Sequence, residues 1–282
     1  MAEQVLFQDA SGQLVTRSTL RAALEACGAA DADVLFIHSD LTFGQPNLSL
    51  GRRGIMAGVL DAVRSLGVGT LIVPTFTFSF PNGRDYDVQK SKTKMGAFNE
   101  YFRRQPEAVR SLDPMMSVAA MGEKRYLATE VGHESIGKGC TFDLLHQEAR
   151  VKFLFLGVRP AMCFTYTHYI EYALHVPYRY NRAFTGKVTA ADGTTREETY
   201  ELFVRYAGVE PTDRDDFEQA LLHTGAAKKV SCGDSFLYVV EEKASYALLV
   251  EKIRLDPLYM LAHDYPRPLD DRFEVTGEMV AL

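Results

Sequence analysis

A histidine and a carboxylate lie three positions apart near the middle of the chain, at His168 and Glu171. Residues 164–174 predict a helix, and residues three apart lie on one face of a helix. A histidine with a pKa near neutrality can take a proton from an incoming nucleophile, while a carboxylate orients its ring and favours its charged form. The pair therefore predicts general-base chemistry, although a helical His/Glu pair is also common as a purely structural feature.

Two apolar runs of strand type, residues 34–38 and 70–73, continue directly into small polar residues. At the carboxyl ends of strands in α/β folds, such turns line ligand crevices, and their backbone N–H groups can hold a pyrophosphate or a thioester carbonyl. Polar turn residues also serve simply to pair backbone groups. The residues that we assign to this predicted cleft are His38, Ser39, Asp40, Thr75 and Phe76.

An arginine stands among turn residues in the segment that contains Arg110, Ser111 and Ser117. A guanidinium in that setting can clamp a phosphate, although a surface arginine before a loop fits the sequence equally well. The Gly137-Lys138-Gly139 turn lacks the spacing and the trailing hydroxyl residue of a P-loop. Nucleoside triphosphate binding is therefore not expected.

The elements that must position these residues follow from hydrophobic periodicity. Helices are predicted over residues 17–27, 53–66, 95–104, 123–131 and 164–174, and strands over residues 34–38, 70–73, 117–121 and 151–157. Beyond Pro177 we expect a β-hairpin over residues 186–200, helices over 213–222 and 242–254, and a strand over 235–240. The turn of the hairpin is predicted at Asp192-Gly193, because glycine tolerates a positive φ.

This alternation predicts an α/β fold with a mixed central sheet flanked by helices. The hairpin is an elaboration in the C-terminal third. We expect one domain over residues 1–282, because we find no internal repeat or Pro/Ser-rich linker.

The composition is that of an ordinary soluble globular protein, with 46% hydrophobic and 24% charged residues. A net charge of −6 argues against a nucleic-acid partner, which requires a basic face. No apolar run approaches the roughly 18 residues of a membrane span, and the N-terminus lacks a secretory signal. We therefore expect a cytoplasmic protein without a membrane partner, either monomer or homodimer, and the four dispersed cysteines predict no metal site.

The cysteines also suggest an alternative mechanism. Cys163 lies five residues before His168, and Cys140 follows the Gly-Lys-Gly turn. A Cys-His-carboxylate set can take an acyl group itself and pass it on. A lone cysteine is more often a small buried hydrophobe.

Several of these segments together resemble the aminoglycoside 3-N-acetyltransferase family, over roughly residues 34–179. The most specific stretch runs from Met95 to Gly122 and includes Arg-Arg-Gln-Pro at 103–106, Arg110-Ser111 and a Ser-Val-Ala run at 117–119. The segment Thr167-His168-Tyr-Ile-Glu171-Tyr is similar to the histidine-containing helix of the family.

The resemblance implies transfer of an acetyl group from acetyl-CoA, or another acyl-CoA, to a primary amine of a small molecule, without a metal and without an acyl-enzyme. It implies His168 as general base with Glu171 or Asp216 as carboxylate partner. Coenzyme A would lie against His38, Ser39, Asp40, Thr75, Phe76, Arg110, Ser111 and Ser117, and the amine near Tyr169, Tyr172 and Arg179.

The acceptor stays open between an aminoglycoside antibiotic, another amino sugar or aminocyclitol, and a biosynthetic amine. The chain differs from the resistance enzymes in its first turn (Ser39-Asp-Leu-Thr42), at 113–117 and at 137–141. Two other functions remain as alternatives. One is a thioesterase or hydrolase, disfavoured because no Gly-x-Ser-x-Gly motif is present, and the other is a non-catalytic ligand-binding relative.

Overall fold

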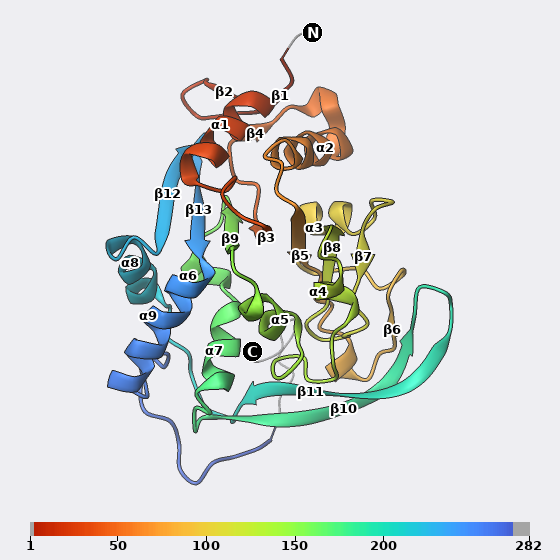
Figure 1. Cartoon of the computed structure of the whole chain (residues 1–282), viewed down its shortest axis with the longest axis vertical. Coiled ribbons are helices and arrows are strands. Elements are labelled where there is room, and N and C mark those ends of the chain that lie inside the picture. Colours follow the sequence, from red (N-terminus) through yellow and green to blue (C-terminus); the bar gives the residue numbers. More distant parts are fainter. Residues whose placement is uncertain (1–2, 273–282) are drawn as a thin grey trace.

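Seven strands form the central sheet of the computed structural model, which describes residues 3–272 (Figure 1). Their order is β12-β13-β9-β3-β5-β8-β7. The three middle strands, β9, β3 and β5, are parallel, and their outer neighbours pair antiparallel. The bounds are β3 Val34–Ser39, β5 Thr70–Pro74, β7 Val109–Arg110, β8 Val118–Gly122, β9 Val151–Leu156, β12 Ala227–Cys232 and β13 Ser235–Glu241. The predicted mixed sheet is confirmed.

Two hydrophobic cores lie on the two faces of this sheet, because successive side chains of a strand point to opposite faces. In β3, Val34 and Phe36 belong to one core, whereas Leu35 and Ile37 belong to the other. The second core is covered by α1 (Arg17–Cys27), α2 (Gly51–Arg64) and α3 (Ala97–Phe102). The first core is covered by α4 (Tyr126–Thr129), α5 (Thr141–Gln147), α7 (Tyr166–Ala173), α8 (Asp215–His223) and α9 (Glu242–Leu255).

A long hairpin crosses the lower end of the molecule in Figure 1. It consists of β10 (Arg179–Thr189) and β11 (Thr195–Arg205), paired over their whole length, and Gly193 in the turn has a φ of 86°. The predicted hairpin is therefore confirmed, with strands longer than expected. It also pairs with β6 (Tyr86–Asp87) near its turn.

The remaining elements are small. A three-stranded sheet near the N-terminus contains β1 (Val5–Gln8), β2 (Leu14–Thr16) and β4 (Gln45–Pro46). The short helices are η1 (Leu48–Leu50), η2 (Phe80–Asn82) and α6 (Pro160–Cys163). Among the described residues, no helix is long and apolar enough to cross a membrane.

Most predicted elements are present with ends shifted by a few residues. The helix expected over 123–131 shortens to α4, where Glu123 to Arg125 form a turn instead. The sequence did not indicate β12, because this edge strand has an exposed, lysine-containing middle. Nor did it indicate α5, whose seven residues are too few for a clear period.

Candidate active site

A cavity of about 480 Å³ lies beside the end of β3 and the start of α7. His38 near the end of β3 and Phe76 just after β5 line it, as expected for the carboxyl edge of parallel strands. His168 and Glu171 of α7 form a further part of the wall. The cavity has the size of a small-molecule site. Its apolar lining includes Phe76, Phe78, Met95, Met162, Met260 and Leu261.

His168 and Glu171 are in contact, as their spacing predicts. Nδ1 of His168 lies 2.9 Å from Oε2 of Glu171, and both side chains are buried. Arg179, the first residue of β10, places Nη2 3.0 Å from the same carboxylate oxygen. Tyr178 donates its hydroxyl to the other oxygen of Glu171 at 2.9 Å. The carboxylate is thus fixed from three sides and holds the imidazole in one orientation.

The position of the imidazole proton follows from the partners of Nδ1. If Nδ1 carried no proton, its lone pair would face a lone pair of the Glu171 carboxylate at 2.9 Å. Nη2 of Arg179, which can only donate, lies 3.0 Å from the same nitrogen, so Nδ1 stands between an acceptor and a donor. We adopt the tautomer with the proton on Nδ1, which donates to Glu171 and leaves Nη2 of Arg179 to pair with the same carboxylate. Nε2 of His168 then carries a lone pair, and among residues 3–272 it has no hydrogen-bond partner. In this tautomer Nε2 is able to accept a proton.

The charges of the pair follow from its surroundings. Burial, together with the charge of Arg179, lowers the pKa of His168 to about 3, against the opposing influence of Glu171. Burial alone would raise the pKa of Glu171, but Arg179 and the hydrogen bond from His168 outweigh it and lower that pKa to about 2. At neutral pH the imidazole is therefore uncharged and the carboxylate is ionised. The pKa of His168 thus lies well below the near-neutral value expected from the sequence, because burial and the charge of Arg179 outweigh the influence of Glu171.

Positive side chains dominate the polar part of the cavity wall. Lys94, Arg179, Arg205 and Arg214 line the cavity, whereas Glu171 is its only acidic lining residue in the described part of the chain. Arg205 is the last residue of β11 and the direct cross-strand partner of Arg179. Burial and the charge of Arg179 lower the pKa of Arg205 to about 10. The guanidinium groups nevertheless stay charged at neutral pH.

Unpaired polar atoms also concentrate at this cavity. Six buried side-chain nitrogen or oxygen atoms of the described residues have no hydrogen-bond partner, and five of them belong to residues of the cavity wall. Buried polar groups are normally paired, so such a concentration indicates a ligand that supplies the missing partners. The five atoms are Nε2 of His38, Oγ1 of Thr165, and Nε of Arg179, Arg205 and Arg214.

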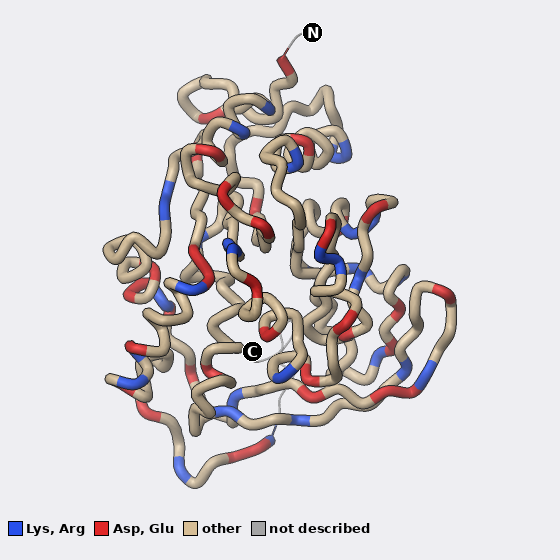
Figure 2. The backbone as a smooth tube through the Cα atoms, in the orientation of Figure 1, with Lys and Arg blue, Asp and Glu red and all other residues tan. Residues whose placement is uncertain are grey.

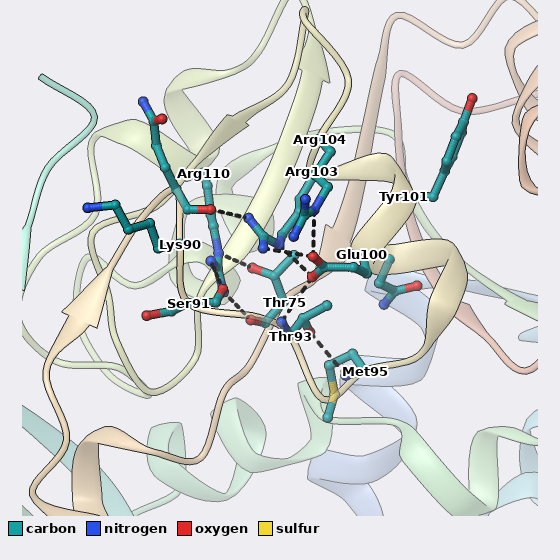
Figure 3. A network of polar contacts seen from close by, with 12 residues as sticks. Thr75, Lys90, Ser91, Thr93, Met95, Glu100, Tyr101, Arg103, Arg104 and Arg110 are labelled. Atoms are coloured by element: carbon teal, nitrogen blue, oxygen red, sulfur yellow. Dashed lines mark hydrogen bonds and ion pairs between the residues drawn. The ribbon is translucent and has the colours of Figure 1, made fainter. Parts of the chain in front are cut away.

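The predicted coenzyme residues Thr75, Arg110, Ser111 and Ser117 make internal hydrogen bonds and do not line the cavity. Figure 3 shows Thr75 and Arg110. Arg110 donates through Nε to Oγ1 of Thr75 at 3.0 Å and through Nη2 to the carbonyl of Thr75 at 2.7 Å. Ser117 donates to that carbonyl at 2.8 Å. In this structure the donors of Arg110 serve backbone carbonyls and the hydroxyl of Thr75. The prediction that the four residues contact coenzyme A stays a prediction.

A neighbouring ion-pair network fixes the loop that brings Lys94 and Met95 to the cavity (Figure 3). Glu100 accepts from Nε of Arg103 at 2.7 Å and from the backbone N–H of Thr93 at 3.1 Å. The Oγ1 of Thr93 in turn accepts from the backbone N–H of Met95 at 3.0 Å. The loop before α3 is thereby tied to the helix that follows it.

The other predicted site residues lie at different places. Ser39 donates to Asn99 at 2.8 Å, and Asp40 is exposed at the end of β3. Asp216 lies exposed in the first turn of α8, so Glu171 is the carboxylate that pairs with His168. Tyr169 donates to Asp143 at 2.7 Å and Tyr172 to Glu134 at 2.8 Å, and neither tyrosine lines the cavity. Of the predicted acceptor residues, Arg179 alone does so.

The two candidate nucleophilic cysteines differ in position. Cys163 lines the cavity, whereas Cys140 is buried elsewhere. Burial raises the pKa of each thiol to about 12. Both are therefore protonated at neutral pH, which disfavours a covalent acyl intermediate, because the thiolate is the nucleophile.

Arg205 and Arg214 are the cavity residues that the sequence interpretation missed. A signal for Arg205 was present: extending the register of the predicted hairpin outward from its turn places Arg205 opposite Arg179. Arg214 lies in an irregular segment, with φ of 63°, just before α8. No periodicity marks such a position.

Known proteins share both the sequence pattern and the fold. Residues 36–254 match the sequence model of a family described as aminoglycoside 3-N-acetyltransferase. Similar solved structures include "AAC-IIIb binary with CoASH", with a TM-score of 0.72 and 20% identity over 89% of this chain and 98% of that chain. The aminoglycoside acetyltransferase AAC(3)-Xa has a TM-score of 0.71 and 22% identity over 85% and 92% of the two chains. The YokD protein from Bacillus subtilis has a TM-score of 0.71 and 17% identity over 90% and 96%.

At these identities the structural likeness establishes the fold, while the family match covers well over half of the sequence. The chain belongs to the aminoglycoside 3-N-acetyltransferase family and is an acyl-CoA-dependent N-acetyltransferase that takes acetyl-CoA as co-substrate.

Proposed function

We propose that this enzyme acetylates a primary amine of a small molecule bound in the 480 Å³ cavity, with His168 as the general base. The observation that carries this proposal is the free Nε2 of an uncharged His168, whose Nδ1 is held by Glu171 at 2.9 Å. The base, its orienting carboxylate and the Arg179 that fixes this carboxylate all line one cavity.

The reaction begins with an amine that lacks its extra proton, because an ammonium has no lone pair. The three arginines of the cavity wall disfavour a further positive charge and therefore lower the pKa of a bound ammonium. As the amine nitrogen attacks the thioester carbonyl, Nε2 of His168 takes its proton. The ionised Glu171 stabilises the imidazolium that forms.

Collapse of the tetrahedral intermediate breaks the carbon–sulfur bond and leaves the acetyl group on nitrogen. The departing coenzyme A thiolate takes the proton from His168, which restores the base. Of the predicted coenzyme residues, His38 and Phe76 line the cavity, and we place the thioester on their side. The pantetheine arm would then approach along the carboxyl edge of β3 and β5.

The test uses the purified chain, acetyl-CoA and a panel of primary amines, with free thiol and acetylated amine measured together. Direct transfer predicts equimolar thiol and N-acetyl product, and no thiol release without an amine. Thiol release without an amine would instead indicate a thioesterase. An acetylated protein peptide after incubation with acetyl-CoA alone would indicate the covalent route through cysteine.

A further inference from the structure

The cavity that holds the base is strongly positive although the chain as a whole is negative. The net charge is −6, and Figure 2 shows acidic and basic residues interspersed along the backbone. The cavity wall, in contrast, combines Arg179, Arg205 and Arg214 with one carboxylate of the described residues, that of Glu171. Glu171 pairs with Arg179, and its charge acts on Arg205 and Arg214 without forming an ion pair with either.

Arg205 and Arg214 have no counter-ion in the described part of the chain. Among residues 3–272, no carboxylate forms an ion pair with either guanidinium. The acidic residues nearest to Arg214 in sequence are used elsewhere: Asp215 pairs with Arg159 at 2.8 Å, and Asp213 accepts the backbone N–H of Asp215 at 3.0 Å. A partly buried cation without a partner is costly, and an incoming anion would remove that cost.

The unpaired side-chain nitrogen atoms and the backbone conformation of these arginines also indicate a ligand site. The Nε atoms of Arg179, Arg205 and Arg214 are all buried and unpaired, and Arg179 itself is only 5% exposed. The backbone of Arg214 is in the left-handed region, with φ of 63°. Strained conformations of non-glycine residues cluster at ligand sites, where the orientation of the side chain offsets their cost.

We infer that the acceptor amine carries an oxyanion group, a phosphoryl or carboxylate group, which binds Arg205 and Arg214 while its amine faces Nε2 of His168. The inference rests on the proposed function and specifies its substrate class. It places the enzyme's acceptor among acidic amino compounds such as amino sugar phosphates, in contrast to the polycationic antibiotics. Arginine suits this role because its planar fork binds both oxygens of such a group.

The phosphates of coenzyme A are a second source of the same chemistry, and the position of the arginines argues against them. Arg179, the cross-strand partner of Arg205, lies 3.0 Å from Nδ1 of His168. When the thioester carbon is at the base, the coenzyme phosphates are separated from it by the whole pantetheine arm. An oxyanion held next to the base therefore belongs to the acceptor.

The oxyanion of the acceptor and the arginines of the cavity affect two steps, binding of the acceptor and deprotonation of its amine. An acceptor held by its oxyanion enters a positive cavity that would repel a plain ammonium. Once bound, its amine loses a proton more readily because of the same cations. The cavity can thus bind the acceptor through one group and deprotonate it at another.

The first experiment compares acceptors that differ by one charged group: glucosamine 6-phosphate against glucosamine, and O-phosphoethanolamine and β-alanine against ethanolamine. We expect kcat/KM to be at least about tenfold higher for the anionic member, since charge-assisted hydrogen bonds are the strong ones. The comparison of O-phosphoethanolamine with β-alanine shows whether the site prefers a phosphoryl or a carboxylate group. Higher kcat/KM for ethanolamine, glucosamine or a polycationic aminoglycoside would overturn the inference while leaving acetyl transfer established.

The second experiment measures the binding of O-phosphoethanolamine and glucosamine 6-phosphate by calorimetry, independently of turnover. Arg205→Gln and Arg214→Gln should each weaken binding about 10- to 100-fold. Arg196→Gln is the matched control, because Arg196 is an exposed arginine of the same strand outside the cavity. Wild-type binding without turnover would support the anion site and count against the proposed function. No binding of either compound to the wild-type enzyme would overturn the inference.

The KM for acetyl-CoA in the same variants shows whether the arginines bind the oxyanion of the acceptor or the phosphates of coenzyme A. We expect the KM for acetyl-CoA to change less than about threefold in Arg205→Gln while the acceptor KM rises. A tenfold rise in the KM for acetyl-CoA, with an unchanged KM for the acceptor, would assign the arginines to the coenzyme and overturn the inference. Circular dichroism and thermal melts of the variants confirm that they fold.

Discussion

Arg179 and Glu171 form an ion pair inside the molecule, with 3.0 Å between Nη2 and Oε2 and with both side chains almost fully buried. The pair joins the first residue of the hairpin to the helix that carries the base. It therefore determines both the fold near the cavity and the orientation of His168. Removing either partner of this ion pair should therefore destabilise the protein.

Glu171→Gln leaves a buried guanidinium without its carboxylate, and Arg179→Met leaves a buried carboxylate without its guanidinium. Each single change should lower the free energy of unfolding by about 3–5 kcal/mol, because an uncompensated buried charge is expensive. The double variant should be more stable than the sum of the two losses predicts. Urea unfolding of the four proteins measures the coupling, and strictly additive losses would mean that the pair is not coupled.

His168→Asn removes the base while keeping a polar side chain of similar size. We expect kcat to fall at least about 10²-fold, with the affinity for acetyl-CoA unchanged. Steady-state kinetics with an accepted amine, together with calorimetric titration of acetyl-CoA, measure the two quantities. A variant that turns over at nearly the wild-type rate would exclude His168 from proton transfer.

Cys163→Ala tests the covalent alternative, since Cys163 is the cysteine that lines the cavity. Because burial raises the pKa of this thiol to about 12, it is protonated at neutral pH and should not act as nucleophile. We expect kcat to stay within about threefold of wild type. A loss of 10²-fold or more, with the fold intact by circular dichroism, would favour an acyl-cysteine intermediate.

Ser117→Ala distinguishes an internal role from a coenzyme contact in the network around Thr75. Ser117 donates to the carbonyl of Thr75 at 2.8 Å, and loss of one such hydrogen bond costs about 1 kcal/mol of stability. If the role is internal, the free energy of unfolding falls by about that amount and the KM for acetyl-CoA does not change. A tenfold rise in that KM without a loss of stability would place coenzyme A at Ser117.

Acid should destabilise the protein through His38, whose ring is buried and stacks on Phe155 at 5.0 Å. Burial and the charge of Arg214 lower the pKa of His38 from 6.5 to about 3. Between these two values the unfolded chain binds the proton and the folded chain does not. The contribution of His38 to stability is therefore complete above pH 6.5 and falls as the pH drops towards 3, by up to about 1.4 kcal/mol per unit. His168, whose pKa is also lowered to about 3, adds a loss of the same sign.

His38→Phe keeps the ring and removes the titration, so it should make the loss of stability between pH 6.5 and pH 5 smaller. Urea unfolding at several pH values measures the slope. His263→Gln changes an exposed histidine and serves as the control, with the wild-type slope expected. An identical slope in His38→Phe and wild type would show that the buried imidazole does not contribute.

The sequence was most informative where a local pattern determines geometry. The spacing of His168 and Glu171 on a helix was sufficient to predict their contact, and the continuous apolar runs of β3 and β9 were sufficient to predict buried strands of the sheet. The Asp192-Gly193 turn likewise predicted the hairpin. In each case the determining interactions connect residues that are close in sequence.

Features that depend on distant segments were not predictable in this way. The carbonyls of Val88 and Ser91, which accept from Arg110, come from an irregular loop that no periodic pattern marks. The same holds for the meeting of Arg205 and Arg214 at one cavity, since Arg214 follows a segment without regular structure. The sequence indicated which polar side chains follow the strands, but it did not indicate which residues they contact.

The register of the hairpin has a consequence for how such an enzyme can diversify. Arg179 and Arg205 face each other across one rung of the ladder, so they project from the same side of it. Arg179 pairs with Glu171, and Arg205 lines the cavity, where our proposal places the oxyanion of the acceptor. A substitution at position 205 can therefore change the charge of the cavity, and with it the preferred acceptor. The contacts of Arg179 with Glu171 and His168 on the neighbouring strand and helix would stay the same. In this proposal, β11 carries the arginine that selects the acceptor, and β10 carries the arginine that positions Glu171.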